Sequence, residues 1–172
     1  NTVVGTIMTN LGFIKFCERE GIRFNGTPGA SYQDTSFVFQ VWASARRAAI
    51  LPKGYLHYRV DNANSSVKSS AKVFAVCDEY ELSREFLAKD PEKQRAFGAI
   101  VNLLKLGTYR WNFNRLTDES RRAFAERMRE EYLRAREEGT LERDMFAPAD
   151  WEMLNLMMDD FDAFMARFES GM

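Results

Sequence analysis

The sequence predicts an α+β protein that is predominantly α-helical, with a small β-hairpin and short strands in its N-terminal part and helices alone in its C-terminal part. From about residue 71 onward, apolar residues recur at spacings of three and four, and capping residues separate the periodic runs. Between residues 48 and 59, two short apolar runs flank the turn sequence Pro52-Lys53-Gly54, which is typical of a hairpin. The composition shifts toward charge near residue 70, which divides the chain into residues 1–70 and 71–172.

The overall composition is that of an ordinary globular protein. The chain has 172 residues, of which 45% are hydrophobic and 28% charged, enough for one domain-sized core. Its 24 Lys and Arg residues nearly balance its 25 Asp and Glu residues, so the chain has no excess of positive charge that would favour nucleic acid as a partner. Cys17 and Cys77 are expected to be buried thiols, and the sequence contains no self-contained zinc motif. No apolar run approaches the roughly 20 residues that span a bilayer.

The N-terminal part is expected to contain two helices joined by a strand and a loop. A short helix from residue 9 or 10 to Gly21 places apolar side chains on one face. A brief strand over residues 22–24 and a loop rich in glycine and proline over residues 25–29 follow. Residues 35–47 are apolar nearly all round, which predicts a helix buried on more than one side. A polar loop over residues 61–70 closes this part.

The C-terminal part is expected to contain four helices. They cover residues 72–88, 90–109, 117–139 and 150–168. The second begins with Asp90 as a cap and Pro91 at the first helical position. The charged run over residues 127–138 predicts a solvated outer face for the third helix. The last helix places Met and aromatic residues on one stripe, namely Trp151, Leu154, Met158, Phe161, Met165 and Phe168.

Asp34 is the most conspicuous candidate for chemistry. It stands where a glycine-containing loop turns into the apolar helix, so its side chain could cap the helix by accepting a backbone N–H. A carboxylate held at a helix N-terminus is also kept ionised by the helix dipole, as a general base requires. The two roles are compatible, and the local sequence alone favours the cap.

A second group of polar residues follows in and beside the polar loop. His57 lies on a strand-like segment, where a lone histidine is more often structural than a ligand. The cationic and hydroxyl groups around the loop could together bind a phosphate, although a solvated loop has the same composition. These residues are Arg59, Ser65, Ser66 and Lys68.

Taken in order, residues from about 22 to 68 resemble the second half of the catalytic domain of bacterial family-two glycosyltransferases. In that family an acid pair precedes an apolar helix, a strand pair with a Tyr/His-Tyr-Arg segment follows, and a serine-bearing loop comes next. The matching pieces here are Gln33-Asp34, residues 37–45, Ile50-Leu51, His57-Tyr58-Arg59 and Asn64-Ser65-Ser66.

The resemblance implies that residues 1–70 are the acceptor-side part of a GT-A glycosyltransferase domain, a remnant of its α/β fold, and that residues 71–172 are a helical extension. This sequence has Gln33 where the family usually carries a first acid, so Asp34 alone inherits the role of base. The family's nucleotide-binding half is expected before residue 1, and the isolated chain is therefore expected to be inactive.

In the intact enzyme, the implied reaction is inverting transfer of a sugar from a nucleotide sugar to a glycan or lipid-linked acceptor in surface polysaccharide biosynthesis. Asp34 would remove the proton from the acceptor hydroxyl. A divalent metal, Mg or Mn, would neutralise the leaving diphosphate, while no cofactor is expected in this fragment itself. The residues implied to approach the diphosphate are Gln33, His57, Arg59, Ser65, Ser66 and Lys68, and His57 is also a candidate metal ligand.

The implied partners are the nucleotide sugar and the glycan acceptor, and no nucleic acid. The expected location is the cytoplasm, with peripheral attachment to the inner face of the membrane left open. The alternative function is a non-catalytic helical module for interaction, including homodimerisation through the stripe of the C-terminal helices.

Overall fold

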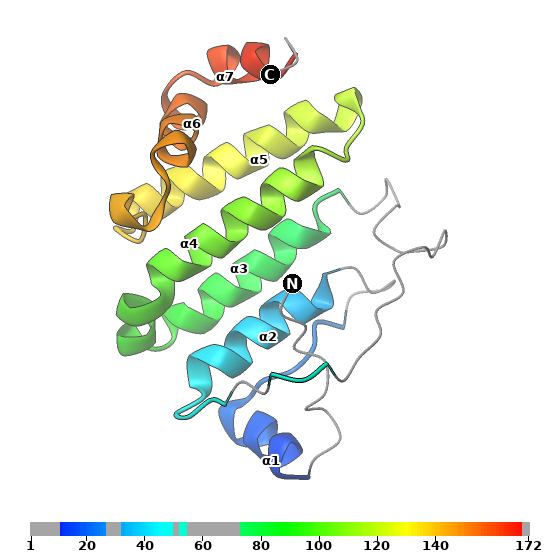
Figure 1. Ribbon diagram of the computed structural model, residues 1–172, viewed down its shortest axis with the longest axis vertical. Coiled ribbons are helices and arrows are strands. Elements are labelled where there is room, and N and C mark those ends of the chain that lie inside the picture. The colour runs from blue at the N-terminus through cyan, green and yellow to red at the C-terminus, as the bar shows by residue number, and fades with distance from the viewer. Residues whose placement is uncertain (1–10, 27–31, 50–51, 55–72, 170–172) are drawn as a thin grey trace. The chain divides into compact units, whose positions relative to one another are not determined.

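A computed structural model describes residues 11–26, 32–49, 52–54 and 73–169 (Figure 1). The chain divides into two compact units, Asn1–Lys72 and Val73–Met172. The described residues form helices and loops and contain no strand, so the predicted α+β class is wrong and the fold is helical. Most of the predicted hairpin, residues 50–51 and 55–59, lies outside the described residues.

Residues 22–24, predicted to form a strand, instead follow the first helix, α1 (Leu11–Glu20), without regular secondary structure. Gly21 has a φ of 68°, and the N–H of Ile22 donates to the carbonyl of Cys17 at 2.8 Å. This is the Schellman arrangement, in which a left-handed glycine lets the chain turn back and satisfy the last carbonyls of a helix. The backbone of Ile22 therefore caps a helix, and its side chain is buried.

The second helix of the N-terminal unit is α2 (Gln33–Ser44). It begins two residues before the predicted start, and Tyr32 precedes it in a left-handed conformation. Phe37 on α2 is buried and contacts Phe13 of α1, with ring centroids 6.2 Å apart. Aromatic packing thus joins the two helices of this unit.

The C-terminal unit is a run of helices in which neighbours along the chain pack on one another, α3 on α4, α4 on α5, α5 on α6 and α6 on α7 (Figure 1). Its elements are α3 (Ala75–Ala88), α4 (Pro91–Phe113), α5 (Asp118–Glu137), η3 (Arg143–Met145), α6 (Pro148–Asp159) and α7 (Phe161–Glu169). The start predicted for α4 is confirmed, because the Asp90 carboxylate accepts the N–H groups of Glu92 and Lys93 and Pro91 is in the first turn. Helices α3, α4 and α5 lie side by side and alternate in direction (Figure 1), as short connections between helices favour.

The single helix predicted over residues 150–168 is in fact two helices, with a break at Asp160. Asp160 has φ −139° and ψ 80°, outside the helical region. Its carboxylate accepts the N–H of Ala163 at 3.0 Å and so caps α7. An apolar stripe with helical spacing cannot reveal this break, because the residues on both sides of it still face the core.

Three of the six residues of the predicted Met and aromatic stripe, Leu154, Met158 and Met165, are buried inside this unit. The buried apolar side chains of α6 and α7 are Leu154, Met157, Met158, Phe164 and Met165.

None of the helices within residues 11–26, 32–49 and 73–169 combines the length and the apolar character that a membrane span requires.

Candidate functional site

The first candidate site is the start of α2, where Gln33 and Asp34 occupy the first turn. Tyr32 is the N-cap residue, with φ 61° and ψ 9°, and no side chain makes a capping hydrogen bond there. The prediction that Asp34 caps the helix is therefore wrong. Its carboxylate is instead exposed in the first turn of the helix.

A left-handed conformation is uncommon for a residue with a bulky side chain, and Tyr32 is the only non-glycine residue of the described ranges that adopts it. Conformations of this kind cost free energy and cluster at functional sites. The strain lies directly before the two predicted site residues. The remaining predicted site residues, His57, Arg59, Ser65, Ser66 and Lys68, lie outside the described residues.

An aromatic pair lies on the same side of α2 as Asp34. Phe24 stacks on Phe37 with ring centroids 3.9 Å apart and planes 5° apart. Residues three apart on a helix are neighbours on its surface, which places Asp34 beside Phe37. The exposed ring of Phe24 is thus linked through Phe37 to the first turns of α2, where Asp34 lies.

The second candidate is a buried polar cluster between α4 and α5 that sequence reasoning did not find. The Glu131 carboxylate accepts the hydroxyl of Tyr109 at 2.6 Å and Nε of Arg127 at 2.7 Å. The ammonium of Lys105 lies 3.5 Å from the same carboxylate and 4.6 Å from the ring centroid of Tyr132. The side chains of Lys105 and Glu131 are only 7% and 3% exposed, so the ion pair is shielded from water.

Glu131 belongs to the run of residues 127–138 that was predicted to be a solvated surface, and this prediction is wrong for Glu131 and Tyr132. A signal for the cluster does exist in the sequence. Lys105 is the only charge in an otherwise apolar stretch of α4, and such a lysine needs a partner when it is buried. Nothing in the local sequence, however, identifies Glu131 as that partner.

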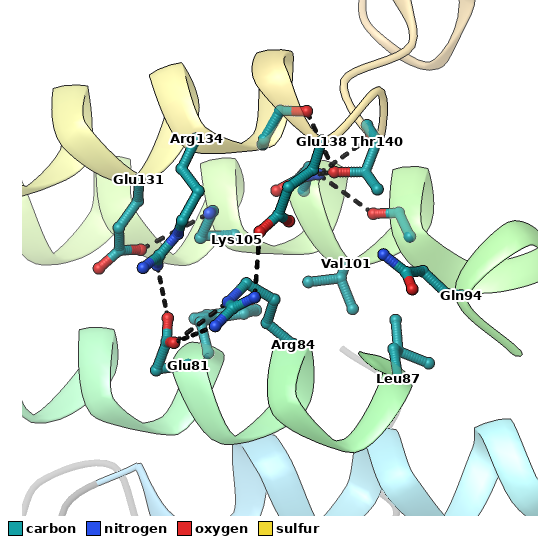
Figure 2. A pocket seen from close by; sticks show the side chains of 14 residues that line it. Glu81, Arg84, Leu87, Gln94, Val101, Lys105, Glu131, Arg134, Glu138 and Thr140 are labelled. Atoms are coloured by element: carbon teal, nitrogen blue, oxygen red, sulfur yellow. Dashed lines mark hydrogen bonds and ion pairs between the residues drawn. The ribbon is translucent and has the colours of Figure 1, made fainter. Parts of the chain in front are cut away.

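A small cavity of about 30 Å³ lies next to this cluster, between α3, α4 and α5 (Figure 2). Glu81 accepts hydrogen bonds from Arg84 at 2.7 Å and from Arg134, and Arg84 also pairs with Glu138 (Figure 2). Burial raises the pKa of Glu81, but the hydrogen bonds and charges of Arg84 and Arg134 outweigh it and lower that pKa. The cavity is large enough for one water molecule and not for a substrate. We therefore assign the cluster and its cavity a structural role.

A larger groove of about 330 Å³ lies between the end of α4 and helices α5, α6 and α7. Arg110 at its edge pairs with Asp150, and Arg167 and Glu152 also line it. Its charges balance, so the groove favours neither an anion nor a cation. Its apolar lining comes from Phe113, Met128, Ala149, Met153, Leu156 and Phe164.

Among the residues that the structure describes, no three His, Cys, Asp or Glu side chains converge to form a metal site. The suggested ligand His57 lies outside this part of the chain. No family model, no curated protein and no solved structure matches the chain.

The buried cluster predicts that the protein unfolds more easily at alkaline pH. Burial raises the pKa of Cys77 from 9.0 to about 12 and that of Tyr80 from 10.0 to about 12, and it raises the pKa values of Tyr109 and Tyr132 well above 10.0. The folded protein thus keeps protons that the unfolded chain releases above pH 9. Each such group lowers the free energy of unfolding by about 1.4 kcal/mol per pH unit within its window. Burial lowers the pKa of Lys105, which acts in the opposite direction up to its ordinary value of 10.5.

The contributions of Lys105 and Cys77 have opposite signs and act first, whereas the three tyrosines contribute from about pH 10, so the melting temperature should fall most steeply between pH 10 and pH 11. Thermal unfolding followed by circular dichroism between pH 7 and pH 11 measures this. Tyr80→Phe removes one of the four groups and should make the fall shallower above pH 10. A melting temperature that stays level to pH 11 would show that these side chains are not buried as described.

Proposed function

We propose that this chain supplies the acceptor-activating part of an inverting glycosyltransferase, with Asp34 as the general base. One observation of the structure supports it above the others. Asp34 sits exposed in the first turn of α2, beside a strained Tyr32, and it is not used as a helix cap. The reaction class, glycosyl transfer, is inferred from the order of the motifs between Gln33 and Lys68, which resembles that of family-two glycosyltransferases.

The proposed chemistry is a single displacement. The acceptor hydroxyl gives its proton to a carboxylate oxygen of Asp34, and its oxygen attacks the anomeric carbon of the donor sugar. The bond from that carbon to the diphosphate breaks, and the nucleoside diphosphate leaves with the electron pair. A base on an ordered helix end holds a fixed position relative to its substrate.

The test uses the protein as its gene encodes it. The purified protein is incubated with Mn²⁺, a panel of UDP-, GDP- and dTDP-sugars and a panel of methyl pyranosides, and release of nucleoside diphosphate is measured. Proton NMR then gives the anomeric configuration of the product. We expect release that depends on the acceptor, with inverted configuration. Retained configuration, or no release above the protein-free control for any donor, would contradict the proposal.

The alternative, homodimerisation through the C-terminal helices, has less support. Three of the six side chains on which it depends, Leu154, Met158 and Met165, are buried within their own unit and are each less than 10% exposed. A surface that is already covered offers little area to a partner.

A further inference from the structure

Phe24 presents one face of its ring to solvent. Its other face is covered by Phe37, with ring centroids 3.9 Å apart and planes 5° apart. Phe24 is nevertheless 44% exposed, whereas Phe37 is 6% exposed. Because one face is covered, the exposed area of Phe24 belongs to its outer face and its edge.

The covered face of the Phe24 ring packs on a series of aromatic side chains. Phe37 contacts Phe13 edge-on at 6.2 Å, and Phe13 in turn stacks with Phe16 at 6.3 Å. Phe24 follows Gly21, the glycine of the Schellman turn, by three residues. An exposed ring with an ordered aromatic base loses little conformational entropy when a ligand stacks on it.

We propose that the outer face of Phe24 is the platform on which the acceptor sugar binds. This inference rests on the proposed function and deepens it, since it assigns a binding residue to the acceptor. The C–H groups on one face of a pyranose carry a partial positive charge and match the negative face of an aromatic ring. Asp34 lies three residues before Phe37, the residue on which Phe24 stacks, so a sugar stacked on Phe24 would bind near the end of α2 that carries the base.

The experiment compares Phe24→Leu, Phe24→Trp and the unchanged protein. Saturation-transfer NMR measures binding of methyl β-D-glucopyranoside, methyl β-D-galactopyranoside, methyl α-D-mannopyranoside and methyl N-acetyl-β-D-glucosaminide, without any donor. We expect at least one pyranoside to bind the unchanged protein. Phe24→Leu should weaken that binding about tenfold, and Phe24→Trp should retain it.

Trp42→Leu is the matched control, because Trp42 is on α2 and is also 44% exposed. It lies eight residues beyond Asp34, about 12 Å along the helix. Its replacement should leave pyranoside binding unchanged. Phe24→Leu keeps apolar cover over Phe37, and Phe24→Trp tests the ring even if the leucine variant does not fold.

The outcomes separate this inference from the function on which it rests. If no pyranoside binds, if Phe24→Leu binds as well as the unchanged protein, or if Phe24→Trp and Trp42→Leu weaken binding equally, Phe24 is not the platform. If binding depends on Phe24 but no nucleotide sugar is turned over, the platform stands as a sugar site and the transferase proposal fails. If transfer occurs and the KM for the acceptor is unchanged in Phe24→Leu, the platform fails and the transferase remains.

Discussion

Asp34→Asn should lower kcat for sugar transfer about 10²- to 10⁴-fold, the range that a positioned general base contributes. Asparagine has nearly the same shape as aspartate but cannot take the proton of the acceptor hydroxyl. The KM for the nucleotide sugar should stay nearly unchanged, because the carboxylate acts on the acceptor. Steady-state kinetics with the donor and acceptor varied in turn measures both quantities.

Asp118→Asn provides the matched control. Asp118 occupies the first turn of α5, as Asp34 occupies that of α2, and its side chain is 94% exposed. Both substitutions remove a negative charge from a helix N-terminus, so any general effect of the helix dipole is shared. The rate of the Asp118→Asn variant should remain within twofold of the unchanged protein. A rate within threefold for Asp34→Asn as well would exclude Asp34 as the base.

Helices that depend on local signals could be predicted from the sequence. The start of α4 is an example, since Asp90 accepts backbone N–H groups from residues only two and three positions away. The end of α1 at Gly21 has a similar local cause. Both features are encoded within five or six residues, which is the range over which capping acts.

The strand predicted over residues 22–24 does not form, and the cause lies in the residues around this segment and not in the segment itself. Alternating apolar residues are compatible with a strand, but Ile22 and Phe24 follow a left-handed glycine and pack within a helical unit. A strand needs a partner that accepts its backbone hydrogen bonds, whereas Ile22 donates its N–H to Cys17. Short apolar runs do not distinguish these two environments.

The position of the candidate base, Asp34, also depends on more than its local sequence. The sequence places an aspartate at the junction between loop and helix but does not determine which residue is the cap. The helix begins two residues earlier than its apolar pattern suggests, so the cap position falls on Tyr32 and Asp34 moves into the first turn. Helix boundaries shift easily by one or two residues, and here such a shift changes the chemical role of a side chain.

Glu131→Ala should be the most destabilising of the substitutions considered, with a loss of about 3–5 kcal/mol in the free energy of unfolding. Glu131 is 4% exposed and accepts hydrogen bonds from Tyr109 and Arg127. Its removal leaves the buried ammonium of Lys105 without its counter-charge and the hydroxyl of Tyr109 without its acceptor. Urea unfolding followed by far-ultraviolet circular dichroism measures the change.

Glu126→Ala is the control on the same helix. Glu126 pairs with Arg122 at 3.3 Å, but both side chains are more than half exposed. Water replaces such a pair at little cost, so the urea midpoint should not move beyond experimental error. A midpoint shift as large as that of Glu131→Ala would mean that the loss follows helix propensity or net charge and not burial.

Replacing three members of the cluster together separates the value of the ion pair from the cost of breaking it. The triple variant Lys105→Met, Glu131→Leu and Tyr109→Phe removes both charges and the hydroxyl together while keeping apolar volume. Buried ion pairs are often no more stabilising than well-packed apolar residues, because desolvation offsets most of the attraction. The triple variant should therefore recover most of the stability lost in Glu131→Ala. If the triple variant is as unstable as Glu131→Ala, the charges themselves stabilise the packing of α4 against α5. The ion pair would then add more to the free energy of unfolding than well-packed apolar residues do.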